Sequence, residues 1–292
     1  MPEKVRLLIT GGSGYLGRRL VHHARAHWDV TATYLSHPPL MRGCCWMRLD
    51  VCDPQEVARL LERVVPQVVI HTAARRGGAD MVRVNVDGTC HVALAALQVG
   101  ARVIHLSTDV LFDGRKGHYV ESDPPSPITP YGRSKADAET LLAELMPEAT
   151  VVRTSLIYGF HTPDHVARWM LEALQQGQRL TLFTDERRCP IWVETLAAAL
   201  LELAKLEYAG VLHVAGGQVL SRYEFGTRLL GIHGVDLSGV VPVLATDLGL
   251  VRPLNCALDI KAARALLETP LLGVDEVIAR LQKSVKRSLS PC

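Results

Sequence analysis

The sequence predicts an α/β protein in which a doubly wound parallel sheet is followed by a smaller lobe. Three observations lead to this prediction. Apolar, β-branched runs alternate with helical segments through the first half of the 292 residues, a glycine-rich segment follows the first run, and the alternation loosens after about residue 155. Such alternation is typical of βαβ units whose strands are buried on both faces. The chain is long enough for one such domain and an appended lobe.

Strands are predicted first, from short runs of β-branched and apolar residues at 5–10, 30–34, 68–72, 103–107 and 150–154. Helical spacing of apolar residues lies between them, at 14–26, 54–64, 84–99 and 131–145. The start of the second helix is marked by Asp53 as N-cap, Pro54 in the first turn and Glu56 three residues after the cap. This pattern predicts a capping box.

The second half of the chain is less regular. Irregular segments with Gly and Pro separate four predicted helices, at 164–175, 195–206, 223–230 and 275–286. No composition change marks a linker between the two halves. We therefore expect a first domain over residues 1–155 and a second lobe over 156–292, interleaved so that the boundary is approximate.

Composition excludes several function classes. The 32 basic and 30 acidic residues give a net charge of +2, which provides no broad field for binding nucleic acid or an anionic membrane. Seven cysteines without a Cys-x-x-Cys pair argue against a disulfide framework and a zinc site, and the histidine spacing suggests no other metal. No apolar run approaches the ~18 residues of a membrane span. We expect a cytoplasmic protein without a metal.

The glycine-rich segment 10–17 follows the first predicted strand and opens the first helix. Glycines at Gly11, Gly14 and Gly17 suit a tight turn and a close backbone approach to a pyrophosphate, and a helix N-terminus offers N–H groups to an anion. The alternative is a strand-to-helix turn with no ligand. We expect this loop to bind a dinucleotide through Gly11, Ser13, Gly14, Tyr15 and Leu16.

The end of the second predicted strand bears on cofactor choice. No carboxylate lies between 33 and 37, where an acidic residue would hold the ribose 2′-hydroxyl of NAD. Ser36 and His37, with Arg18 or Arg19, could instead donate to a 2′-phosphate, so NADP is favoured and NAD stays the alternative. These residues could also be an ordinary exposed loop. The candidates around the adenosine are Tyr34, Ser36, His37, Asp50 and Val51.

A catalytic pair is suggested at the start of the helix predicted over 131–145. Thr129 is a plausible N-cap with Pro130 at the first position, so Tyr131 and Lys135 share one helix face. A phenol has a pKa near ~10, and a neighbouring ammonium would bring it toward neutrality, as an acid catalyst requires. Alone, a Tyr and a Lys four residues apart are a weak signal.

Polar residues at the end of the fourth predicted strand strengthen this interpretation. Ser107, Thr108 and Asp109 lie at the carboxyl edge of the sheet, where open α/β folds bind ligands. Thr108 could orient a substrate carbonyl, or it could be an ordinary strand-end cap. The order of glycine loop, threonine and Tyr-x-x-x-Lys is far more specific than any of its parts.

With these motifs the chain resembles an extended short-chain dehydrogenase/reductase, and within that group the dTDP-4-dehydrorhamnose reductases. The matching segments span nearly the whole length: 10–17, 71–74, 85–89, 107–114, 119–123, 131–135, 153–155, 158–159 and 252–255. The resemblance implies an NAD(P)-binding Rossmann-type domain, a substrate-binding lobe and a catalytic triad of Thr108, Tyr131 and Lys135. It also implies cofactor contacts from Thr72, Ala73, Ala74, Asn85, Ser107, Tyr131 and Lys135.

Three departures from the family pattern concern the substrate. Arg75 and Arg76 begin a short segment after Ala74 where the family has a longer loop, and they could clamp a diphosphate or be a solvated basic face. Leu156 replaces a usual tryptophan, and the segment 185–190 is more charged than in the family. The substrate candidates are Thr108, Asp109, Val110, Leu156, Arg188 and Arg252.

The expected activity is reduction of a keto group, with hydride from the reduced cofactor and a proton from Tyr131. The resemblance suggests the 4-keto group of a nucleotide-activated deoxysugar, in an enzyme for which a homodimer is a possible assembly. Two alternatives stay open. One is an epimerase or dehydratase of the same superfamily, and the other is a non-catalytic NADP-binding subunit like the regulatory partner of methionine adenosyltransferase.

Overall fold

The computed structural model describes residues 4–160 and 165–288, and its centre is a seven-stranded parallel sheet. The strands are β1 Arg6–Thr10, β2 Asp29–Tyr34, β3 Cys45–Arg48, β4 Val68–His71, β5 Arg102–Thr108, β6 Thr150–Thr154 and β11 Gly210–His213. Their order is β11-β6-β5-β4-β1-β2-β3. The chain therefore adds β2 and β3 on one side of β1, and then β4, β5, β6 and β11 on the other side. Ligands of doubly wound sheets bind where this direction reverses.

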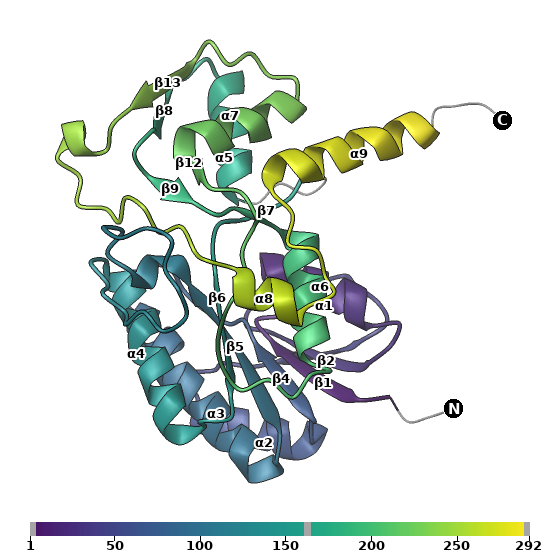
Figure 1. The fold of residues 1–292 in the computed structure, drawn as a ribbon. Coiled ribbons are helices and arrows are strands. Elements are labelled where there is room, and N and C mark those ends of the chain that lie inside the picture. The colour runs from purple at the N-terminus through teal and green to yellow at the C-terminus, as the bar shows by residue number, and fades with distance from the viewer. Residues whose placement is uncertain (1–3, 161–164, 289–292) are drawn as a thin grey trace.

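Two helical layers cover the sheet (Figure 1). One layer holds α2 Pro54–Val64, α3 Gly88–Val99 and α4 Pro130–Leu145, and the other holds α1 Tyr15–Ala24 and α6 Val193–Leu203. Alternate residues of β1 face the two layers, because successive strand side chains point to opposite faces. Leu7 and Ile9 belong to the core cluster that contains α1 and α6, whereas Leu8 belongs to the one that contains α2 and α3.

A smaller lobe stands above the carboxyl ends of the strands (Figure 1). It has its own apolar cluster, which joins α5 and α7 to the small β8-β13 sheet. Its elements are β7 Ile157–Tyr158, α5 His165–Gln175, β8 Leu180–Phe183, β9 Arg187–Arg188, β10 Ile191–Trp192, β12 Leu220–Ser221, α7 Arg222–Ile232, β13 Val240–Val243, a 3-10 turn Thr246–Leu248 and α9 Val274–Ser288. The helix α8 Lys261–Leu266 lies with the central fold, where it contacts β11 and its Ala263 belongs to the core cluster of α1 and α6.

The chain crosses between the central fold and the upper lobe more than once. After entering the upper lobe at β7 the chain returns to the central fold with α6 and β11, and β11 pairs with β6 at the sheet edge. It then goes back to the upper lobe at β12. Within the described chain, no helix combines the length and the apolar character that a bilayer crossing requires.

The five predicted strands are confirmed, and β3 and β11 were not named among them. The helices predicted after residue 155 are all present with small shifts at their ends, although position 164 lies outside the described residues. The predicted capping box at α2 is wrong, because only one of its two reciprocal hydrogen bonds is present. Asp53 accepts from the Gln55 and Glu56 amides as expected, but the Glu56 carboxylate accepts from the Asp50 amide at 3.0 Å. The true capping box joins Ser221 and Glu224 at α7.

Candidate active site

The turn between β1 and α1 is built for a close approach of other groups to its backbone. Gly11 has a φ of +67°, and a Cβ there would lie 2.7 Å from the Ala73 amide nitrogen. Gly17 faces the Gly11 carbonyl with no space for a side chain. Gly14 caps α1 without any side-chain hydrogen bond. Because no side chain occupies this helix N-terminus, an anionic group fits against it.

Two cavities meet at this turn. The first, here called the sheet-edge cavity, encloses about 350 Å³ and is lined by Gly11, Ser13, Gly14, Thr33, Tyr34, Leu35, Leu49, Asp50, Val51, Thr72, Ala73, Ala74, Arg75 and Val84. The second, the central cavity, has a similar volume of about 350 Å³. Both include Gly11, Gly14, Thr72 and Ala74 in their walls. They therefore form one groove across the topological switch point, long enough for an extended ligand.

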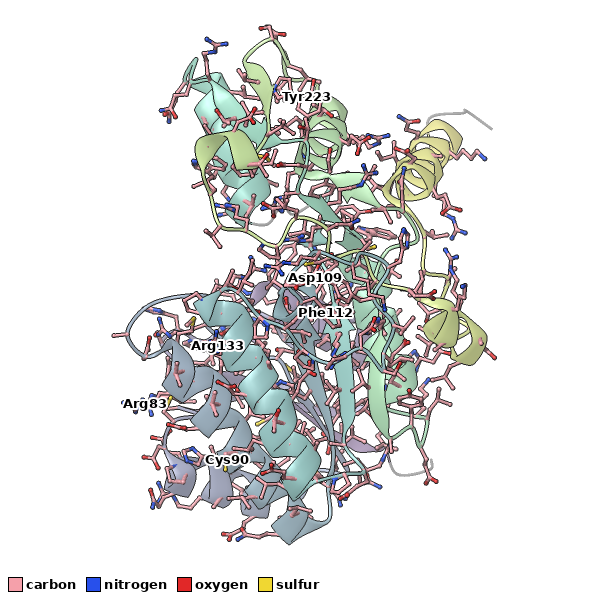
Figure 2. The ribbon with its side chains drawn as sticks, turned by 60° about the vertical axis from the view of Figure 1, so that its left-hand side comes forward. Arg83, Cys90, Asp109, Phe112, Arg133 and Tyr223 are labelled. Atoms are coloured by element: carbon pink, nitrogen blue, oxygen red, sulfur yellow. The ribbon has the colours of Figure 1, made fainter. Side chains whose placement is uncertain are left out.

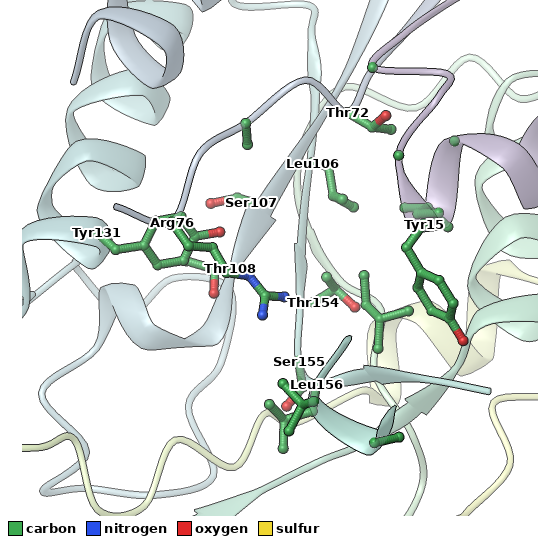
Figure 3. A pocket seen from close by; sticks show the side chains of 18 of the residues that line it. Tyr15, Thr72, Arg76, Leu106, Ser107, Thr108, Tyr131, Thr154, Ser155 and Leu156 are labelled. Carbon is green, nitrogen blue, oxygen red and sulfur yellow. The ribbon is translucent and has the colours of Figure 1, made fainter. Parts of the chain in front are cut away.

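The inner end of the central cavity carries the catalytic candidates (Figure 3). Ser107 and Thr108 reach it from the end of β5, and Tyr131 reaches it from the first turn of α4. α4 begins here because Thr129 accepts from the Gly132 amide at 3.0 Å and Pro130 occupies the first helical position.

The position of α4 relative to β5 is set by backbone contact. A Cβ on Gly132 would overlap the carbonyl oxygen of Val110, which lies in the short 3-10 turn after Thr108. The first turn of α4 therefore packs directly on the segment that carries Thr108. This contact brings the Thr108 and Tyr131 hydroxyls to the same wall of the cavity.

The phenol of Tyr131 is in a mixed environment. Its pKa is raised above the ordinary value, because burial and the charge of Asp109 outweigh the lowering effect of the nearby Arg76 guanidinium and Thr108 hydroxyl. Figure 3 shows the Arg76 side chain beside Tyr131 and Thr108 in the cavity wall. The Arg76 and Thr108 side chains thus favour ionisation of the phenol, whereas its desolvated surroundings oppose it.

Lys135 is fully buried below this wall. Its Nζ lies 2.9 Å from Nε2 of His105, whose ring stacks on His71 with centroids 5.4 Å apart. Burial lowers the pKa of Lys135 to about 8, with Glu139 opposing the shift. Burial and the Lys135 charge lower the pKa of His71 to about 3 and that of His105 well below its usual value. Both imidazoles are therefore neutral, and His105 accepts from the lysine.

Asn85 connects the loop after β4 to α4. It lies in a π-helical turn, Arg83–Asp87, at the start of α3, and its Oδ1 accepts from the Arg75 amide at 2.8 Å. Its Nδ2 donates to the Arg75 carbonyl and to Ser134 Oγ, at 2.8 and 2.9 Å. One buried amide thus holds the Arg75 backbone, next to Arg76, at a fixed position relative to the helix of Tyr131.

A buried ion cluster closes the side toward the upper lobe. Asp109 and Arg188 are each 3% exposed or less, with a carboxylate to guanidinium distance of 3.6 Å. Glu186 contacts three arginines from different segments: Arg188 at 3.2 Å, Arg252 at 3.4 Å and Arg222 at 3.5 Å. Figure 2 places Asp109 and Phe112 between the sheet and the upper lobe. The cluster joins the lobes next to the cavity.

A third cavity, here called the lateral cavity, adjoins this cluster. It encloses about 460 Å³ and is lined by Val110, Thr129, Tyr131, Glu186, Arg188, Leu250, Val251, Arg252 and Pro253. Tyr131 therefore lines both the central and the lateral cavity. Arg252 is half exposed above the Phe183 ring, 5.1 Å from its centroid, whereas Arg188 is buried and donates to the Pro253 carbonyl at 2.9 Å.

Comparison with known proteins agrees with this geometry. Residues 5–286 match the family described as the RmlD substrate binding domain. The chain belongs to the RmlD-like extended short-chain dehydrogenase/reductases. It is accordingly an NAD(P)-dependent oxidoreductase, and the family and fold class predicted from the sequence are confirmed.

Three relatives illustrate the range of this RmlD-like family. The chain is 30% identical to the probable low-salt glycan biosynthesis reductase Agl14 of Haloferax volcanii, over 94% of this chain and 96% of that one. It is 36% identical to a dTDP-4-dehydrorhamnose reductase of Mycobacterium tuberculosis, over 82% and 79%. A dTDP-4-dehydrorhamnose reductase of Bacillus anthracis, solved with NADP, superposes with a TM-score of 0.82 at 24% identity, over 95% and 98%.

Most residues predicted for the RmlD-like site do line the three cavities, among them Ser107, Thr108, Tyr131 and Leu156. Others are placed differently. Ser36 and His37 are exposed just beyond Leu35, Asn85 and Lys135 lie behind the cavity walls, and the buried Asp109 accepts from Ser155 at 2.6 Å. The sequence did not indicate the far wall of the central cavity, which α5 and α7 supply through Val166, Ala167, Met170, Arg222, Phe225 and Leu229.

Proposed function

We propose that this RmlD-like enzyme reduces the 4-keto group of a nucleotide-activated deoxysugar with NADPH. The observation that carries the proposal is the position of Tyr131, in the wall that the central and lateral cavities share. A ketone placed there has the dinucleotide groove on one side and a cationic cavity on the other. The names of the Haloferax and Mycobacterium relatives support a sugar as substrate.

The cofactor fits the groove formed by the sheet-edge and central cavities. Gly11 and Gly14 leave room for a pyrophosphate at the α1 N-terminus, and Tyr34, Asp50 and Val51 surround the adenosine end. When bound, reduced nicotinamide supplies the hydride. No carboxylate follows β2, and Arg18 folds back on the Ser13 carbonyl at 2.8 Å, so a cation lies near the phosphate turn. Both features favour NADP over NAD.

The protein's own groups then orient the ketone and provide its proton. Thr108 donates a hydrogen bond to the carbonyl oxygen, and Tyr131 transfers its phenolic proton to that oxygen as the alcohol forms. The buried position of the phenol keeps it protonated until the oxygen gains charge. Lys135 would hold the nicotinamide ribose, and its Nζ, now 2.9 Å from His105 Nε2, would have to leave that ring to do so.

The lateral cavity is the site proposed for the nucleotide diphosphate. Arg252 is the half-exposed cation there, and the Phe183 ring supports its guanidinium. Arg188 holds Asp109 and Glu186 in place, so we assign it to the cavity wall. Leu156 and Phe225 give the central cavity an apolar wall toward the sugar.

A substrate screen tests the proposal. Nucleotide-linked 4-keto sugars and matched free keto sugars are offered with NADPH and NADH, and loss of reduced nicotinamide absorbance is followed. We expect turnover on a nucleotide sugar, and Arg252→Ala should raise KM for it by about 10-fold while changing KM for a free keto sugar little. Equal activity on both ketones would contradict the substrate assignment.

Two other outcomes would support the alternatives. NAD that stays bound through purification and cycles without net consumption indicates an epimerase or dehydratase. Binding of NADPH with no turnover on any ketone, together with tight binding to another protein, indicates a regulatory subunit.

A further inference from the structure

Arg76 brings a cation to the reacting end of the central cavity. It lies in the loop after β4, and its side chain lines the cavity with Thr108 and Tyr131 (Figure 3). Its side chain lies beside the phenol of Tyr131, and its charge lowers the pKa of that phenol. The loop is not free to carry the side chain elsewhere, because Asn85 holds both the amide and the carbonyl of Arg75.

Lys135, the cation expected to support the phenol, is engaged elsewhere. Its Nζ is bonded to His105 at 2.9 Å, the side chain is 2% exposed, and Glu139 is the carboxylate that acts on it. Across the described residues that line the central cavity, the cations are Arg76 and Arg222. Arg222 is paired with Glu186 at 3.5 Å. Arg76 is therefore the cation at the phenol.

We propose that Arg76 is a further catalytic residue, which hydrogen bonds the Tyr131 oxygen and stabilises the phenolate left after proton transfer. The inference rests on the proposed ketone reduction. In that step the carbonyl carbon accepts a hydride from bound reduced nicotinamide, the carbonyl π bond breaks, and the oxygen takes the Tyr131 proton. The negative charge then lies on the Tyr131 oxygen beside the Arg76 guanidinium. Water reaches the exposed loop of Arg76 and returns the proton to the phenolate.

The other charged groups near Tyr131 do not replace this contact. Asp109 lies on the β5 side and opposes ionisation of the phenol, and it is itself paired with Arg188. The remaining charged groups that face Tyr131 come from the lateral cavity and from its own helix, and they are Glu186, Arg188, Arg252 and Lys135. Both lateral arginines are paired with Glu186. Without Arg76, the charge of Asp109, which raises the pKa of the phenol, would therefore be the main charge acting on it.

The experiment compares Arg76→Gln and Arg76→Lys with Arg133→Gln. Arg133 is a matched control, because it is an exposed arginine near the start of α4, the helix of Tyr131 (Figure 2), and lines none of the three cavities. Two readouts are used. One is the pH dependence of kcat for ketone reduction. The other is the tyrosinate absorbance of Tyr131 with NADPH bound, obtained for each variant as its absorbance minus that of the same variant carrying Tyr131→Phe.

The pH profile should separate a catalytic Arg76 from a binding one. Reduction needs the protonated phenol, so kcat falls as the pH rises through the pKa of Tyr131. In Arg76→Gln we expect this falling limb and the tyrosinate transition to move to higher pH by about one unit. We also expect kcat at neutral pH to fall by about 10-fold. Arg76→Lys should recover part of both effects, and Arg133→Gln should match the wild type.

Opposite results are easy to recognise. If Arg76→Gln raises KM for a nucleotide sugar and leaves the pH profile and the tyrosinate transition unmoved, Arg76 is a diphosphate clamp and the inference is wrong. If the wild type reduces no ketone, the proposed function fails, and the absorbance titration still decides whether Arg76 acts on Tyr131.

Discussion

Replacing Lys135 by methionine should measure the free-energy penalty of burying its charged amine. The pKa of Lys135 is lowered from 10.5 to about 8 by burial, and its Nζ is bonded to a neutral His105. Between these two pH values the unfolded chain binds more protons than the folded one, so stability rises with pH across this window. Below pH 8 the buried amine of Lys135 is protonated, so the folded protein is destabilised by the full free energy of burying this charge. A shift of this size corresponds to about 3 kcal/mol.

Lys135→Met removes the titrating group and leaves His105 Nε2 without its donor. The second effect is destabilising by about 1 to 3 kcal/mol, and it does not change with pH because His105 stays neutral. We therefore subtract the free energy of unfolding of the wild type from that of Lys135→Met at each pH. This difference should be about 2 kcal/mol more favourable to the mutant at pH 7 than at pH 10.

Urea unfolding followed by circular dichroism measures this difference. Lys205→Met, at an exposed lysine just after α6, is the control for loss of an amine. If the stability difference between Lys135→Met and wild type is the same at both pH values, the lysine is not held in a desolvated site, and the reasoning is refuted.

Three further outcomes are expected. Tyr131→Phe should lower kcat by at least ~10²-fold with nearly unchanged cofactor affinity, and near-normal turnover would remove Tyr131 from its role as acid. NADPH should bind more tightly than NADH in calorimetric titration, and a clear preference for NADH would show that the residues after Tyr34 do not contact a 2′-phosphate. Gly132→Ala should lower the thermal midpoint and kcat together, because the new methyl group overlaps the Val110 carbonyl; a variant with wild-type values for both would show that α4 can shift without consequence.

The parts of the fold that could be predicted are those set by local chemistry. The first turn of α4 is specified by Thr129 and Pro130, and the β1 to α1 turn by its glycines. β3 was not among the named strands because it is a sheet-edge strand with the sequence Cys-Trp-Met-Arg, which lacks β-branched residues. β11 has only four residues and is a strand because it pairs with β6.

The site shows the same division between local and tertiary effects. Thr108 and Tyr131 could be predicted because each lies at the end of a regular element that the sheet topology brings to one edge. The contacts of Lys135 and Arg188 could not, because they depend on His105 and Asp109, which come from other segments and are packed by the whole fold. The expected clamp at Arg75 and Arg76 is divided, since Arg75 pairs with Asp80 at 3.0 Å while Arg76 reaches the phenol.

The contact between Gly132 and the Val110 carbonyl has a consequence for how this enzyme can diverge. Two backbones meet there with no side chain between them, so the spacing of the Thr108 and Tyr131 hydroxyls, the proposed catalytic pair, is set by atomic radii and not by the residues of the core. Substitutions at Leu156 or Phe225 can reshape the wall toward the substrate without moving Thr108 or Tyr131. The range of ketones accepted can therefore change through the upper lobe while the proton-transfer geometry stays constant.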